Sequence, residues 1–214
     1  MVYGNLNRYI YTAILARWIG VEYLGIYSLA NSIMLIGEVV AKMGLETGIL
    51  RYVSKLDPEK DQTQIKALIQ SALKMAGVFS IGITLIMIAG AGWLVNDLFN
   101  AQPILESVLF VFAIIIPFNA FTLLGAYATQ GFKILKYKVG VTQFFNPSIL
   151  LLSMLGIYTL FSKESTLMYP MAFTAVFGAI SIFIILRKIS GVTLKGIISA
   201  PFNRELLRFS IPLM

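Results

Sequence analysis

The sequence predicts an all-α membrane protein built as a bundle of six transmembrane helices. Hydrophobic residues make up 58% of the 214 residues and charged residues only 13%, against about 25% charged in a soluble domain. The mean hydropathy of +0.83 is too high for a surface that faces water. The apolar residues occur in continuous rather than alternating runs, which favours helices over a closed barrel, and only these two structures satisfy the backbone in lipid.

Five stretches are long enough to cross a bilayer core of roughly 30 Å, which takes about 20 helical residues. We number them spans 2 to 6, and they run over Tyr23–Ala41, Leu68–Leu94, Ile104–Ala128, Val139–Phe161 and Leu167–Leu186. The pattern of span 2 allows its helix to continue as far as Val53.

Two further stretches are incomplete spans. Val2–Ile19 is short and carries polar and charged residues, and a last apolar run has only begun where the sequence ends. We therefore expect a truncated first helix and the start of a seventh, in a natural protein that is longer in both directions. Residues 1–188 would form a six-helix transmembrane lobe, residues 189–208 a cytoplasmic amphipathic linker, and residues 209–214 the start of the seventh helix.

The residue 189–208 stretch mixes basic side chains with apolar ones. A helix lying in the plane of the headgroups suits this mixture, and so does an ordinary basic connector. The sequence leaves both alternatives open.

Basic residues collect in the loops after spans 2, 4 and 6, which hold four, three and five of the 17 Lys and Arg residues. The positive-inside rule places these loops in the cytoplasm, and the N-terminus with them. We expect a multi-pass protein of the cell membrane. The net charge of +7 then faces anionic lipid headgroups, so nucleic acid is not an expected partner.

The sequence offers no catalytic machinery. It contains no Cys and no His, which excludes thiol nucleophiles, histidine bases and Cys/His zinc sites. It has neither a GxxxxGK[ST] phosphate loop nor a GxGxxG fingerprint. We therefore expect no enzyme activity, no cofactor and no metal site.

Charged residues inside a span are candidates for function because inserting each costs roughly 2.5–3.5 kcal/mol. Glu38, Lys42 and Glu46 follow one another at i, i+4 and i+8, and Ser28 and Asn31 extend the same stripe of span 2. One interpretation is the polar wall of a water-filled cavity. The other is that Lys42 and Glu46 already lie among the cytoplasmic headgroups.

The first stretch repeats this pattern more weakly, with Asn5, Arg8 and Thr12 on one helix face. Arg8 could meet a phosphate with its planar fork, or it could be an end anchor whose side chain reaches the headgroups.

Spans 4 and 5 each combine a proline with an amide side chain, Pro117 with Asn119 and Asn146 with Pro147. A proline frees a backbone carbonyl and kinks its helix. Such kinks suit helices that bend during transport, and they also occur as inert packing features. The candidate substrate-binding residues are Arg8, Asn31, Glu38, Lys42, Asn119 and Asn146.

Several segments together resemble a known family. Ala16–Gly20, Glu22–Ala30, Gly44–Tyr52, Gly131–Lys133 and Arg208–Leu213 resemble, in this order and spacing, segments of polysaccharide and O-antigen flippases. These flippases belong to the multidrug/oligosaccharidyl-lipid/polysaccharide exporter superfamily.

The resemblance implies a protein of twelve to fourteen helices in two six-helix lobes, of which this chain is the N-terminal lobe. It also implies a function, the movement of polyprenyl-pyrophosphate-linked glycans from the inner to the outer leaflet by alternating access. Arg8 and Lys42 would attract the pyrophosphate, and Glu38 would hold Lys42 or take part in ion coupling. No cavity residue of the family can be carried over by motif.

The resemblance implies as partners the lipid-linked glycan, membrane lipids, the second lobe and a glycan polymerase or ligase. Two other functions also fit the sequence. A multidrug cation antiporter of the same superfamily should favour buried carboxylates over basic residues, whereas the charges in these spans are mixed. A non-transporting membrane scaffold of a glycan assembly complex would need no polar stripes that face one another.

Overall fold

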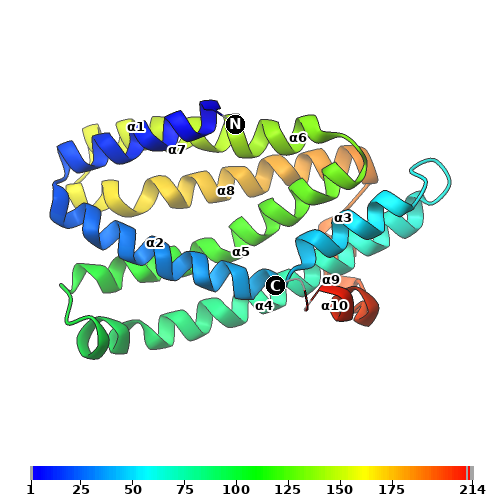
Figure 1. The fold of residues 1–214 in the computed structure, drawn as a ribbon, viewed down its shortest axis with the longest axis horizontal. Helices are drawn as coiled ribbons and strands as arrows, with labels where there is room; N and C mark the ends of the chain where they lie inside the picture. Colours follow the sequence, from blue (N-terminus) through cyan, green and yellow to red (C-terminus); the bar gives the residue numbers. More distant parts are fainter. Residues whose placement is uncertain (1, 211, 213–214) are drawn as a thin grey trace.

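The computed structural model describes residues 2–210 and 212, and in this part of the chain every regular element is helical (Figure 1). Two elements, η1 and η2, are single π-helical turns. The elements are α1 (Val2–Trp18), α2 (Val21–Lys42), α3 (Leu45–Lys55), α4 (Gln62–Trp93), η1 (Leu94–Leu98), α5 (Ile104–Gly131), α6 (Leu135–Val139), η2 (Gly140–Phe145), α7 (Asn146–Leu160), α8 (Lys163–Ser190), α9 (Leu194–Ser199) and α10 (Arg204–Ser210).

The prediction of an all-α membrane bundle is confirmed. Five helical segments are long and apolar enough to cross a bilayer, and they contain the predicted spans 2 to 6 almost entirely. The long helices run lengthwise beside one another, with α5 between α8 on one side and α2 and α4 on the other (Figure 1). The 17-residue α1 matches the short first stretch.

One difference from the prediction concerns span 2. Its helix does not continue to Val53, because α2 ends at Lys42 and a new helix begins at Leu45. The two residues between them, Met43 and Gly44, have left-handed backbones with φ of 47° and 69°. This conformation ends a helix, and glycine adopts it at little cost. Glu46 consequently lies on α3, so the stripe predicted along one helix is divided.

Span 5 contains the π-helical turn η2 immediately before Asn146 and Pro147. Pro147 has no N–H to offer the carbonyl one turn earlier, and its ring crowds that turn. The wider turn relieves this conflict, as such bulges do within α-helices. Pro117, by contrast, lies inside the continuous helix α5.

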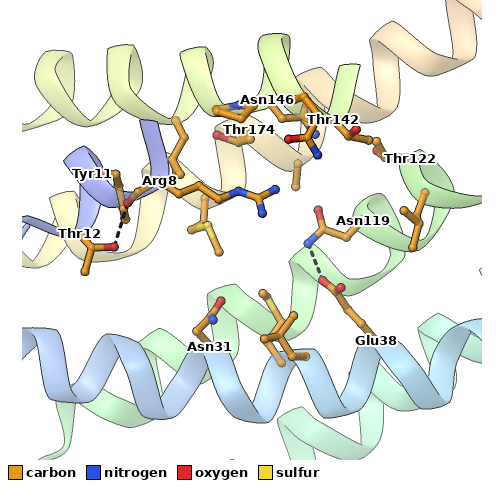
Figure 2. A pocket seen from close by; sticks show the side chains of 18 of the residues that line it. Arg8, Tyr11, Thr12, Asn31, Glu38, Asn119, Thr122, Thr142, Asn146 and Thr174 are labelled. Atoms are coloured by element: carbon orange, nitrogen blue, oxygen red, sulfur yellow. Dashed lines mark hydrogen bonds between the residues drawn. The ribbon is translucent and has the colours of Figure 1, made fainter. Parts of the chain in front are cut away.

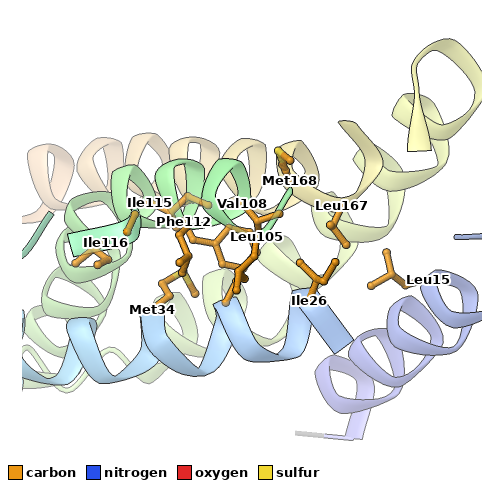
Figure 3. Packing of buried hydrophobic residues seen from close by; sticks show 14 of the residues in the cluster. Leu15, Ile26, Met34, Leu105, Val108, Phe112, Ile115, Ile116, Leu167 and Met168 are labelled. Atoms are coloured by element: carbon orange, nitrogen blue, oxygen red, sulfur yellow. The ribbon is translucent and has the colours of Figure 1, made fainter. Parts of the chain in front are cut away.

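The apolar core has two main clusters along α5. One packs Met34 of α2 and Phe112 of α5 with Leu15 of α1 and Leu167 of α8 (Figure 3). The other joins α3, α4 and α5 with the chain after α8, and it includes the fully buried Val192. Packing in both clusters fixes the rotation of α5 about its axis. In this rotation the face that carries Asn119 is turned toward α2.

The predicted linker is held against α4. Lys74 Nζ donates a hydrogen bond to the Ala200 carbonyl oxygen at 2.8 Å. Ser71 Oγ donates to the Pro201 carbonyl oxygen at 2.6 Å and accepts from the Asn203 N–H at 3.1 Å. These contacts fix the course of the chain between α9 and α10.

The linker stretch does not form one amphipathic helix. Helix α8 extends through Ser190, α9 has only six residues, and α10 begins at Arg204 rather than at Phe209. Of the predicted seventh helix, residues 211, 213 and 214 lie outside the described residues. The assignment of three segments as lobe, linker and next helix stays a prediction.

Candidate functional site

The helices form an open cavity of about 770 Å³ that is lined largely by polar side chains (Figure 2). Its walls come from α1, α2, α5, α8 and the continuous α6–η2–α7 segment. The polar lining residues are Arg8, Tyr11, Thr12, Tyr27, Ser28, Asn31, Ser32, Glu38, Asn119, Thr122, Tyr127, Lys138, Thr142, Gln143, Asn146 and Thr174. Along α2 the cavity reaches from Tyr27 to Glu38, roughly 16 Å of helix.

Glu38 and Asn119 face each other from α2 and α5 (Figure 2). Asn119 Nδ2 donates a hydrogen bond to Glu38 Oε1. The Glu38 side chain is only 8% exposed, and a buried carboxylate is costly unless it accepts hydrogen bonds. The Asn119 amide therefore stabilises a negative charge in this wall of the cavity.

Arg8 extends from α1 into the cavity, with its guanidinium between Asn119 and Thr142 (Figure 2). The position of α1 explains this direction. Tyr3 Oη lies 3.0 Å from Ser148 Oγ, and at Gly4 a Cβ would come within 2.9 Å of the backbone oxygen of Gln143. Because α1 lies this close to η2 and α7, Arg8 is presented to the space that these helices enclose.

Some lining groups have unused hydrogen-bonding capacity. Asn146 Oδ1 and Tyr11 Oη are buried without a hydrogen-bond partner among the described residues. Gly178 of α8 packs against the Asn146 side chain, where a Cβ would meet Oδ1 at 2.9 Å. These two atoms are covered by packing, whereas accessible lining groups such as Asn31 on the opposite wall could bind an uncharged polar solute (Figure 2).

The structure therefore brings five of the six predicted site residues to one cavity: Arg8, Asn31, Glu38, Asn119 and Asn146. Lys42 is not among the lining residues, although it follows Glu38 by one helical turn. Glu46 lies beyond the break between α2 and α3, and its Oε2 is buried without a partner among the described residues. That these residues bind substrate stays a prediction.

Lys138 is a lining residue that the sequence interpretation missed. The sequence pattern assigns it only to a basic cytoplasmic loop, because the predicted span 5 begins at Val139. The available signal is its spacing four residues before Thr142, which places both side chains near one helix face.

The cavity lining combines charged side chains with neutral polar ones. Two cations, Arg8 and Lys138, and one carboxylate, Glu38, are surrounded by amides and hydroxyls. Among residues 2–210 and 212, no group of three or more acidic, His or Cys side chains could hold a metal ion. The cavity can hold a polar solute with negative charge inside an otherwise apolar bundle.

A multi-pass helical bundle with a polar cavity between its helices has the architecture of a membrane transporter. The profile of one family, described as "Polysaccharide biosynthesis protein", matches residues 1–214. The chain belongs to this polysaccharide biosynthesis family, whose members are generally transporters rather than enzymes. Searches among curated proteins and among solved structures gave no match. Family and architecture together fit a membrane transport role in polysaccharide biosynthesis.

Proposed function

We propose that the protein flips a polyprenyl-pyrophosphate-linked oligosaccharide or polysaccharide precursor from the inner to the outer leaflet by alternating access. The observation that carries this proposal is the cavity itself, in which Arg8 projects among polar side chains that are mostly uncharged (Figure 2). A charged side chain in a membrane-spanning bundle is costly and is a candidate for function.

In this proposal the substrate divides among three environments. Its pyrophosphate binds the Arg8 guanidinium, whose planar fork suits phosphate oxygens. Its sugars exchange water for hydrogen bonds with amides and hydroxyls such as Asn31 and Asn146. Its polyprenyl chain stays in the lipid, so the cavity needs to desolvate only the polar head. No covalent step is required.

Alternating access needs a second lobe that closes the cavity to each side in turn, and we propose that the complete protein supplies it. The distribution of basic residues supports a cytoplasmic N-terminus. We also propose a glycan polymerase or ligase as a functional partner, because such an enzyme consumes glycan that has reached the outer leaflet. A proton, a sodium ion or the membrane potential could each drive the cycle.

A second candidate function is a multidrug cation antiporter. The buried carboxylate of Glu38 favours it, because a cation in the cavity would need a negative partner. Against it stand the two cations in the same lining, which would repel a cationic drug. We therefore favour the flippase.

The test measures lipid-linked glycan in the outer leaflet of cells whose only copy of the complete gene carries Arg8→Ala. We expect the flux to fall about tenfold or more, because the variant loses one charge-assisted hydrogen bond to the phosphate. The matched control is Arg17→Ala, which removes the same charge from the exposed end of the same helix, outside the cavity.

Equal flux in wild type, Arg8→Ala and Arg17→Ala would contradict the role of Arg8. Unchanged glycan flux in cells that lack the gene, together with increased sensitivity to cationic drugs, would instead favour the antiporter.

A further inference from the structure

Lys138 presents a positive charge to the cavity, and the contacts made by its ammonium group are neutral. Its Nζ donates a hydrogen bond to Gln130 Oε1 at 2.7 Å and lies 3.4 Å from the centroid of the Tyr127 ring. Tyr127 and Lys138 both line the cavity. An amide oxygen and an aromatic face stabilise an ammonium group, but neither neutralises its charge.

The local fold explains why a residue close to a loop reaches the cavity. After α5, Lys133 takes a left-handed backbone with φ of 62°, and α6 then runs directly into η2. In a regular helix, Lys138 and Asn146 would point about 80° apart. One extra residue in a π turn reduces this difference to about 20°. The π turn therefore aligns Lys138 with Asn146.

Lys138 and Arg8 occupy different parts of the cavity. Lys138 belongs to α6, at the end of the bundle that also carries the connection between α3 and α4 (Figure 1). The guanidinium of Arg8 comes from α1 and points toward the level of Asn119 and Thr142 (Figure 2), and Thr142 lies one helical turn after Lys138, further from that end. If the positive-inside orientation holds, the end that carries Lys138 is the cytoplasmic one.

We infer that Lys138 is a diphosphate-binding group at the entrance of the cavity, which receives the head of the polyprenyl carrier before Arg8 does. This inference rests on the proposed function. An ammonium group has three N–H donors, and the hydrogen bond to Gln130 uses one of them. Phosphate oxygens can take the others.

The contacts with Gln130 and Tyr127 also prepare Lys138 for binding. A lysine side chain that is already held loses less conformational entropy when a ligand binds than a free one does. Lys136, two residues earlier on the same short helix, is exposed and does not line the cavity. The structure thus distinguishes one lysine of this connection from its neighbour.

The chemistry that Lys138 recognises is a phosphate ester, which could also belong to a bilayer lipid or to a free anion. The polyprenyl diphosphate is favoured because the remaining lining residues, such as Asn119 and Asn146, suit a glycan attached to it. A bilayer phospholipid would leave these groups unused.

The experiment measures binding of farnesyl diphosphate to the purified complete protein by isothermal titration calorimetry. Farnesol, inorganic pyrophosphate and dispersed short-chain phosphatidylglycerol serve as comparison ligands. We expect Lys138→Gln to weaken farnesyl diphosphate binding about tenfold, as for loss of one charge-assisted hydrogen bond. Lys138→Arg should retain most of the affinity, and Lys136→Gln all of it.

Three outcomes would overturn the inference. The first is wild-type affinity in Lys138→Gln. The second is an equal loss in Lys136→Gln, which would reveal a general effect of loop charge. The third is equally tight binding of phosphatidylglycerol or pyrophosphate to wild type with the same dependence on Lys138, which would indicate an unspecific anion site.

The outer-leaflet assay separates this inference from the proposed function. Normal glycan flux in wild type, with unchanged binding and flux in Lys138→Gln, would overturn only the role of Lys138. Absence of both glycan flux and farnesyl diphosphate binding in wild type would overturn the proposed function and the inference with it.

Discussion

The contact between Glu38 and Asn119 joins α2 to α5 inside the bundle. The only side-chain hydrogen bond to the Glu38 carboxylate among the described residues comes from Asn119, 81 residues away in the sequence, while Lys42 lies one turn further along α2. At the scale of single residues, this makes Asn119 a structural support for a charge as well as a lining group.

Replacing Asn119 with Leu leaves the Glu38 carboxylate buried without this donor. We expect the free energy of unfolding to fall by about 1–3 kcal/mol, the cost of an unsatisfied buried polar group. Adding Glu38→Leu should recover much of this loss, because the unpaired charge is then gone. Thermal unfolding of the purified variants measures both effects, and strictly additive losses in the double variant would show that the two side chains are not coupled.

At the scale of elements, the break between α2 and α3 determines which polar residues share a cavity. Two consecutive left-handed residues, Met43 and Gly44, redirect the chain. As a result α3 packs against α5, α4 and α10, while Glu38 on α2 remains in the cavity wall. One of the two left-handed residues, Gly44, has no Cβ, so this turn is less strained than it would be with a side chain at both positions.

Replacing Gly44 with Ala puts a Cβ on a residue with φ of 69°. We expect a loss of about 1–2 kcal/mol in the free energy of unfolding, the cost of a left-handed backbone for an L-residue. Gly25→Ala is the control, since a Cβ there meets no atom within 4 Å, and alanine favours helix. Comparable melting temperatures for the two variants would contradict the proposed cause of the break.

At the scale of the whole molecule, the bundle has two ends that differ in charge. Most of the basic residues lie in the connections after α3, α5 and α8 or in the helical turns beside them, whereas Glu22, Asp97 and Glu164 lie in helical turns beside the opposite connections. By the positive-inside rule this asymmetry predicts a cytoplasmic N-terminus, and with it the leaflet that each end of the cavity would face.

Single cysteines test this orientation, because the 214 residues contain none. Lys60 lies between α3 and α4, Lys163 starts α8 at the other end, and both are exposed. In a cysteine-free version of the complete protein, a membrane-impermeant maleimide should label Lys163→Cys in intact cells. It should label Lys60→Cys only after permeabilisation. The reverse pattern would place the N-terminus outside.

Much of the bundle could be predicted because long apolar runs have one solution in lipid. Spans 4 and 6 were located within a few residues, since helix α5 and helix α8 are continuous. The predicted course of span 2 failed at Met43 and Gly44, because periodicity continues through a turn that only the backbone reveals. Similarly, the π turn that directs Lys138 inward leaves no mark in a hydrophobicity pattern.

The sequence by itself determined that this chain is a helical membrane protein, because its apolar spans and scarce charges fit no aqueous fold. It also indicated that Arg8, Asn31, Glu38, Asn119 and Asn146 are unusual for residues within spans. Only the tertiary structure decided that these five share one cavity, that Lys42 does not line it and that Lys138 does. The physical reason is that local turns, and packing between segments distant in the sequence, decide which face of each helix is turned toward the cavity.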